Sequence, residues 1–224
     1  MRFAGNSMPN SWIDFLPTLL KGAEITIIVA FFSAILAIAM SFAAGLCRLS
    51  KLWIVRTATA VYVEVFRGTS LLVQLFWLYF ALPFIGIELP KMLAAILAIG
   101  LNFGAYGSEI VRSAVLAVPK GQWEAAVALN MRPWQRLWNV ILPQASLRML
   151  PPFGNQLVEL IKSTSLVYFI TMADLTYQAM VLRNNYISWT TEILVLLLLM
   201  YFVIATLVSM AVRLLERKLT AGRL

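Results

Sequence analysis

Residues 193–212 read ILVLLLLMYFVIATLVSMAV and contain no charged side chain. Because a helix crosses the hydrocarbon core of a bilayer with about 20 mainly apolar residues, this stretch predicts a membrane span. The composition agrees, since 61% of the 224 residues are hydrophobic, only 12% are charged and the mean hydropathy is +0.84. Soluble domains carry about twice that charged fraction. Lipid is therefore the expected solvent for much of this chain.

Four further segments complete a predicted all-α polytopic membrane bundle of five transmembrane helices, in one domain that covers residues 1–224. Three of the segments are uncharged: residues 25–47, 68–87 (extending back through Val61) and 92–108. The fourth, Pro152 to Ala173, carries Glu159 and Lys162, which lie three residues apart and so share one helix face. Charged side chains within a span face the bundle interior or a water-filled path, and we expect this pair to do the same.

The distribution of lysine and arginine predicts how the chain lies in the membrane. These residues gather in the first loop (48–56), in the third loop (118–148) and in the C-terminal tail, and they are sparse in the alternating segments. Cytoplasmic loops of membrane proteins carry such an excess. We therefore expect the N-terminus outside and the C-terminus in the cytoplasm. The same distribution accounts for the net charge of +8 without a nucleic-acid partner.

The residue types argue against an enzyme. The chain has no histidine and a single cysteine, Cys47, so it lacks the commonest general base and metal ligand and cannot form an internal disulfide. No glycine-rich phosphate loop, metal-ligand cluster or paired nucleophile and base stands out. We predict a membrane protein with no catalytic residue, no metal and no cofactor of its own. Any uphill transport would draw its energy from another subunit or from an ion gradient.

The third loop, residues 118–148, is the one long polar segment, and its amphipathic sequence predicts two short helices. Good helix formers from Gln122 onward place Glu124 in the first turn, where the helix dipole favours an acid. Asn130 can end this helix, because asparagine tolerates left-handed backbone. A proline at position 133 can open the second helix, and the one at position 143 is expected to end or kink it.

This loop resembles the cytoplasmic loop of permease subunits of ABC importers. The resemblance rests on Glu124-Ala-Ala126, on Asn130 in place of the usual glycine, and on Val140-Ile-Leu142-Pro143, where isoleucine usually stands first. Four other blocks, in the same order as in the polar amino acid uptake family, are VEVFRGTSLLVQ (63–74), AYGSEIVR (105–112), VPKGQWE (118–124) and KSTSL (162–166). The first departs from the family pattern at Ser70, where proline is common. Together the blocks cover roughly residues 15–215.

The resemblance implies a type I importer of the histidine, glutamine and arginine kind, in a bacterial inner membrane. In such importers two permeases, identical or related, form the translocation path. Two cytoplasmic ATPase subunits bind ATP and Mg²⁺, and a helix of the permease loop couples their closure to the spans. An extracytoplasmic binding protein delivers polar or charged amino acids, or solutes related to them. The permease itself would bind no cofactor.

Two sets of candidate functional residues follow. The residues expected to contact the ATPase are Gln122, Trp123, Glu124, Ala125, Ala126, Leu129 and Asn130. The candidates for the substrate path are Gln74, Asn102, Glu109, Glu159, Lys162, Thr164 and Ser165.

Each of these assignments has a structural alternative. Glu124 equally suits a role in holding the fold of the loop. For the amides and Glu109, bridging between helices is favoured over substrate contact, and for Glu159 and Lys162 mutual pairing is favoured. A second functional hypothesis is a secondary transporter or channel driven by an ion gradient, with Glu109 and Glu159 as its ion-coupling acids.

Overall fold

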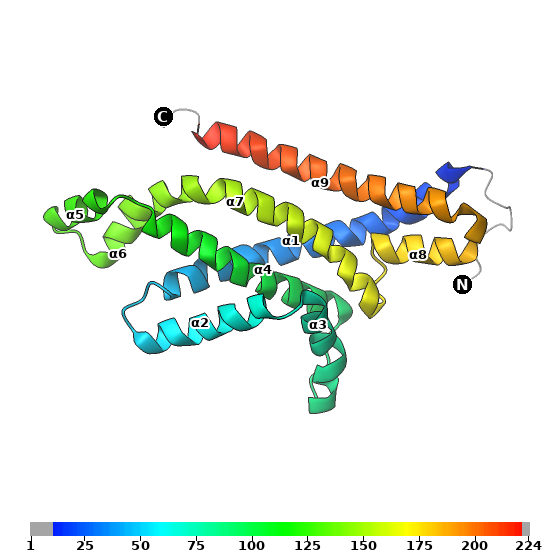
Figure 1. Cartoon of the computed structure of the whole chain (residues 1–224), viewed down its shortest axis with the longest axis horizontal. Coiled ribbons are helices and arrows are strands. Elements are labelled where there is room, and N and C mark those ends of the chain that lie inside the picture. Colours follow the sequence, from blue (N-terminus) through cyan, green and yellow to red (C-terminus); the bar gives the residue numbers. More distant parts are fainter. Residues whose placement is uncertain (1–10, 221–224) are drawn as a thin grey trace.

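The computed structural model describes residues 11–220, and within them the chain is a bundle of helices without a strand. The main helices are α1 (Leu16–Cys47), α2 (Trp53–Gly68), α3 (Leu71–Phe76), α4 (Lys91–Leu116), α5 (Lys120–Ala128), α6 (Pro133–Arg136), α7 (Leu142–Ser163), α8 (Leu175–Asn185) and α9 (Thr190–Thr220). Helices α1, α4, α7 and α9 run along the long axis of the molecule (Figure 1). Helices α5 and α6 lie at one end, hereafter the loop end, and α8 lies at the other.

Three helical segments are long and apolar enough to cross a membrane: Trp12–Cys47, Lys91–Leu116 and Ile187–Lys218. Two bent pairs of helices raise the number to five when each pair is counted as one span. The predicted polytopic bundle of five spans is therefore consistent with the structure. The first span starts earlier than expected, because the short 3₁₀ helix Trp12–Phe15 leads directly into α1.

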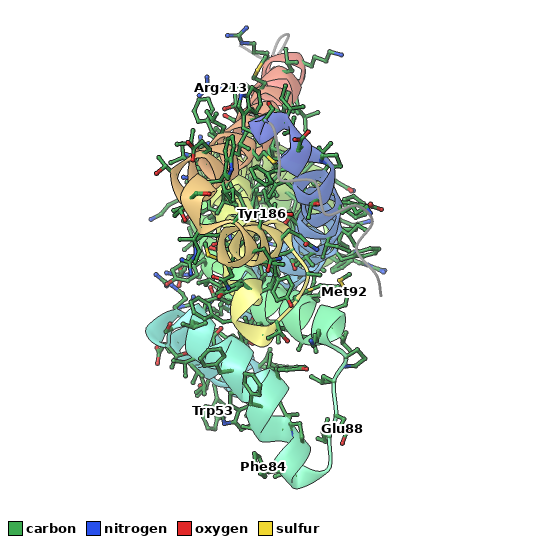
Figure 2. All side chains as sticks on the ribbon, turned by 90° about the vertical axis from the view of Figure 1, so that its right-hand side faces the viewer. Trp53, Phe84, Glu88, Met92, Tyr186 and Arg213 are labelled. Carbon is green, nitrogen blue, oxygen red and sulfur yellow. The ribbon has the colours of Figure 1, made fainter. Side chains whose placement is uncertain are left out.

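The second predicted span, residues 68–87, is wrong as a single helix. Gly68 ends α2, the next two residues are extended, and α3 starts at Leu71 in a direction that differs by 104°. From there a π-helical turn (Trp77–Ala81) and a 3₁₀ turn (Leu82–Ile85) continue outward. These residues, 71–85, form an arm that projects from the bundle, with Phe84 near its tip (Figure 2). Hydropathy measures how apolar a segment is, and it does not report a change of direction.

The fourth predicted span also starts elsewhere than expected. Pro151 and Pro152 lie inside α7, which continues upstream through a π-helical turn (Leu137–Ile141) into α6. Pro143 therefore does not end the loop helix, because the wider turn before it accommodates the missing N–H. After α7 a 3₁₀ segment (Thr164–Ile170) leads to α8 across a bend of 52°.

Helices α1 and α4 make the most intimate contact of the bundle. A Cβ added at Gly100 would lie 2.6 Å from Leu36, and one at Gly107 would lie 2.0 Å from the Ser41 hydroxyl. Neither distance is compatible with a side chain, so glycine lets the two backbones approach each other. The other large elements pack around this pair, and α4 thereby becomes the central helix that connects the loop end to the arm.

Candidate functional site

Helix α5 and the turn after it form the loop that resembles the coupling element of importers. The helix begins at Lys120 directly after Pro119, two residues earlier than predicted. Glu124 therefore lies in the second turn of α5, and the predicted stabilisation by the N-terminal dipole is wrong. Its side chain is exposed, so within the described chain it is available to a partner.

The end of α5 follows the prediction for Asn130. This residue has φ 53°, in the left-handed region. The N–H of Asn130 donates to the carbonyl of Val127 over 2.9 Å, and the N–H of Met131 donates to the carbonyl of Ala126 over 3.1 Å. These two hydrogen bonds make a Schellman motif, which satisfies carbonyls that a helix end leaves free.

The left-handed residue allows a direct test of the loop fold. Replacing Asn130 by valine is expected to raise amide hydrogen exchange of α5, because left-handed backbone costs a β-branched residue roughly 1–2 kcal/mol. Replacing Asn130 by glycine should leave the exchange unchanged or slow it. Mass-spectrometric exchange of the peptide that contains Ala126 measures both. Equal exchange in the two variants would contradict this account of the turn.

The side chains of α5 divide into a buried and an exposed set. Ala126 is 2% exposed, and Trp123 is partly buried against the apolar cluster between α4 and α7. Ala125 and Leu129 point outward, and Leu129 is 71% exposed. These four residues, all among those expected to contact the ATPase, therefore do not lie on one face of the helix. Trp123 and Ala126 fix the helix to the bundle, whereas Ala125 and Leu129 remain uncovered.

Polar contacts add to the attachment of the loop. The Gln144 side-chain amide of α7 donates to the side-chain oxygen of Gln122, Oε1, over 3.1 Å. The Arg148 guanidinium, also on α7, donates to the carbonyl of Ala117 at the end of α4. These two hydrogen bonds attach α5 to α7, and α7 to the end of α4.

Gln74 and Asn102 meet at the break between α2 and α3. Their amide groups donate to the same carbonyl, that of Phe66, over 2.9 Å and 2.8 Å respectively. Asn102 also donates to the Gln74 side-chain oxygen over 3.0 Å, and Gln74 donates to the Thr69 hydroxyl over 2.7 Å. This arrangement is the helix bridging that the sequence favoured for the two amides. It satisfies a carbonyl that has no helical partner beyond the break.

Asn102 contributes measurably to the stability of the break between α2 and α3. Replacing it by leucine is expected to destabilise the protein by about 2 kcal/mol, because the Phe66 carbonyl and the Gln74 amide lose a partner in a buried place. Thermal unfolding in detergent measures the effect. Ser113→Ala, which removes an exposed hydroxyl from the same helix, is the matched control. If both variants unfolded at the same temperature, the two amides would not hold the break.

Glu109 lies in a cluster of arginines on three helices. Its Oε1 pairs with Nη1 of Arg48, which caps the end of α1, and lies 3.5 Å from Nη1 of Arg67 in the last turn of α2. Its Oε2 accepts a hydrogen bond of 3.2 Å from Nε of Arg112, one turn along α4. The sequence pointed to Glu109 as a bridging residue, but it did not reveal the partners on α1 and α2. They lie 61 and 42 positions away and belong to separate blocks of sequence.

The other path candidates lie apart from these two groups. Glu159 and Lys162 form an ion pair of 2.8 Å, and their side chains are 62% and 56% exposed in the single chain. The Thr164 hydroxyl donates to the Ile161 carbonyl, and that of Ser165 donates to the Lys162 carbonyl, over 2.7 and 2.8 Å. The predicted mutual pairing is therefore present, and in the single chain the pair does not lie in the interior of the bundle. The seven path candidates form three separate groups.

One buried acid, Asp174, was not predicted as a functional or structural residue from the sequence. Asp174 is fully buried at the start of α8, where it accepts hydrogen bonds from the N–H groups of Thr176 and Tyr177 over 3.2 and 2.9 Å. The neighbouring N–H of Leu175 donates to the Thr26 hydroxyl of α1 over 3.1 Å. The helix-capping pattern Asp-Leu-Thr at 174–176 is the local signal that could have revealed it. Its role is to start α8 against α1.

A bundle of apolar spans with broken helices, and with a short loop helix fixed to two of the long ones, is an architecture that suits a transport permease. The chain belongs to the family described as the inner membrane component of binding-protein-dependent transport systems, whose model matches residues 35–221. It is therefore a multi-pass inner-membrane protein and a transport component. Membership of this family also decides between the two hypotheses from the sequence, in favour of the ABC importer over a self-sufficient secondary transporter or channel.

Relatives of known name support the same conclusion. The chain is 47% identical over 218 residues to a probable amino-acid ABC transporter permease of Sinorhizobium fredii, covering 95% of this chain and 91% of the relative. It is 37% identical to the glutamine transport system permease GlnP of Escherichia coli, covering 91% and 94%. It is 35% identical to the arginine transport system permease ArtQ of Bacillus subtilis, covering 94% and 96%.

Solved structures share the fold. A crystal structure of an amino acid ABC transporter with histidines aligns with a TM-score of 0.85 at 31% identity, over 94% of this chain and all of that one. An inward-facing structure of the MetNI methionine ABC transporter aligns with a TM-score of 0.78 at 18% identity, which shows likeness of fold alone. The chain is thus the permease component of an amino acid ABC importer.

Proposed function

We propose that this permease forms part of an ATP-driven importer for polar amino acids or solutes related to them. The observation that carries the proposal is the division of α5 into an anchored side and an uncovered side. A coupling element has to transmit force, so it needs a rigid attachment to the spans and a free surface for the ATPase. Trp123 and Ala126 supply the attachment, and Glu124, Ala125 and Leu129 supply the surface.

The partners follow from this role. Two copies of the permease, or this chain and a related one, would enclose the path, and an extracytoplasmic binding protein would deliver the substrate. Two cytoplasmic ATPase subunits would bind ATP and Mg²⁺ and dock on α5 and the turn at Asn130. The loop at 118–148 then lies in the cytoplasm, together with the C-terminus. The excess of lysine and arginine in this loop and in the tail supports that orientation.

The exposed ion pair of α7 supports a path along that helix. A charged pair within a span is costly to expose to lipid, and such residues face a bundle interior or water. In the single chain Glu159 and Lys162 are more than half exposed. We infer that a second permease covers this face and that the pair borders the path between the two subunits, where it would meet the ammonium and carboxylate groups of an amino acid. Thr164 and Ser165 bond to their own helix, which supports a structural role for them instead.

Reconstitution tests the proposed function. The permease is co-expressed with an ATPase and a binding protein of an amino acid importer from the same genome, purified and placed in proteoliposomes with ATP inside or outside. We expect the ATPase to co-purify, and uptake of labelled glutamine or arginine only where ATP reaches the ATPase. Uptake without ATP that collapses with a proton or sodium gradient would contradict the proposal.

A further inference from the structure

Arg67 connects the break in the second span to the central helix α4. It is the residue before Gly68, at which α2 ends. The Tyr106 hydroxyl of α4 donates to the Arg67 carbonyl over 3.3 Å, and the Arg67 guanidinium lies 5.2 Å from the centre of the Tyr106 ring. With the ion pair to Glu109, both the backbone and the side chain of Arg67 are held by α4.

Glu109 is the group that makes this connection electrostatically stable. Three guanidinium groups surround its carboxylate, so the cluster carries two positive charges in excess. Without the carboxylate, Arg48, Arg67 and Arg112 would repel one another, since like charges that are only partly exposed are poorly screened. The end of α2 would then separate from α1 and α4.

Helix α4 links this cluster to the loop. It continues from Glu109 without interruption to Leu116, and α5 begins at Lys120 after a short turn. A displacement of α5 is therefore transmitted along α4 to Glu109 and Arg67. Gln74, on the far side of the break, donates to the Phe66 carbonyl beside Asn102 of α4, so the start of the arm is held to the end of α2 and follows it.

We propose that Glu109 is a positioning residue, which through Arg67 converts movement of α5 into movement of the arm at residues 71–85. The proposal rests on the proposed function, because it assigns the movement of α5 to the ATPase. The proposal assigns Glu109 to the transmission of conformational change and no longer to the substrate path. Arg67, which is 41% exposed, becomes the residue that determines whether the arm responds to ATP.

The experiment measures the arm directly in the complete complex. Spin labels are attached to Phe84→Cys, at a side chain that is 90% exposed on the arm, and Leu116→Cys, 58% exposed at the end of α4, with Cys47 replaced by serine. Pulsed electron paramagnetic resonance gives the distribution of distances between the two labels, with and without ATP and vanadate. We expect it to shift in the parent complex. The distance distribution should not shift in the Arg67→Gln and Glu109→Gln complexes. Each of these complexes should also consume at least about five times as much ATP as the parent complex for each molecule of labelled glutamine or arginine taken up.

Arg56→Gln is the matched control, because it removes an exposed arginine from the same helix outside the cluster. It should behave as the parent does. Arg67→Lys keeps the charge and is expected to restore part of the distance shift, which a purely structural role would not predict. If Glu109→Gln fails to fold, Arg67→Gln and Arg67→Lys still test whether the cluster transmits the movement.

The outcomes separate this inference from the proposed function. Two outcomes would overturn the role of the cluster and leave the proposed function intact. The first is a parent complex that shows no distance shift. The second is an Arg67→Gln complex that matches Arg56→Gln in the distance shift and in the ATP consumed. A parent that fails to bind an ATPase overturns the proposed function.

Discussion

Replacing Leu129 by aspartate is expected to abolish ATP-driven uptake while the permease remains folded. Leu129 follows α5, is 71% exposed and contributes to no buried cluster of the described chain. Its loss therefore costs the fold little, since exposed substitutions usually change stability by about 0.5 kcal/mol or less. On the proposed docking surface, the same change places a charge where an apolar contact is needed, and we expect binding of the ATPase to weaken at least tenfold, or about 1.4 kcal/mol.

The control for this variant is Leu52→Asp. Leu52 is 67% exposed and precedes α2, where an aspartate is a favourable helix cap. Both variants add one negative charge to the same end of the bundle, but only one lies on α5. Co-purification of the ATPase and uptake of labelled glutamine or arginine are measured for each. Normal coupling in Leu129→Asp, or in Glu124→Lys tested beside it, would show that α5 is not the docking element.

The second large effect is expected at the contact between α1 and α4. Replacing Gly107 by alanine should lower the free energy of unfolding by about 3 kcal/mol, because the new Cβ would lie 2.0 Å from the Ser41 hydroxyl and 2.9 Å from its Cβ. The Ser41 hydroxyl can rotate away only by giving up its hydrogen bond to the Ala37 carbonyl, and the Ser41 Cβ is fixed to α1, so the helices themselves must shift. The estimate is the upper part of the range for overpacked cores. Thermal unfolding in detergent gives the measurement.

Two further variants make the prediction specific. Gly121→Ala changes a glycine of α5 that has nothing within 4 Å of the added Cβ, and it should not lower the stability. Ser41→Gly removes the two nearest atoms that Gly107→Ala would meet and leaves Phe153 at 3.1 Å, so the double variant is expected to recover part of the loss despite the poor helix propensity of glycine. Unchanged unfolding of Gly107→Ala would mean that the two helices are not in close contact.

The parts of the fold that the sequence predicts are those determined locally. Apolar runs located α1, α4 and α9, because burial in lipid requires little more than composition and length. Asn130 was predicted correctly because left-handed backbone is a property of a single residue. The arm was missed because Gly68, Thr69 and Ser70 change the direction of the chain without adding a charge.

The candidate site was predictable to a similar extent. The motif of the loop identified α5, but only the packing of Trp123 against α7 shows which side of the helix is uncovered. Gln74 and Asn102 were recognised as bridging residues from their residue type, whereas the carbonyl that they share lies at a break the hydropathy did not predict. Ion pairs across helices, such as that of Glu109 with Arg48, depend on tertiary contacts that one sequence does not contain.

The length of α1 limits how the subunit can sit in a bilayer. Its 32 residues span about 48 Å at about 1.5 Å per residue, against a hydrocarbon thickness of about 30 Å. Tilts of membrane helices reach roughly 40°, and even that tilt does not fit the whole helix within the lipid. One end of α1 therefore extends beyond the hydrocarbon into the headgroup region, which brings the whole bilayer to about 40–45 Å, and the exposed charges of Lys21 and Glu24 mark it as the N-terminal end. A protein that approaches the membrane from that side would meet this end of α1 at the level of the lipid headgroups.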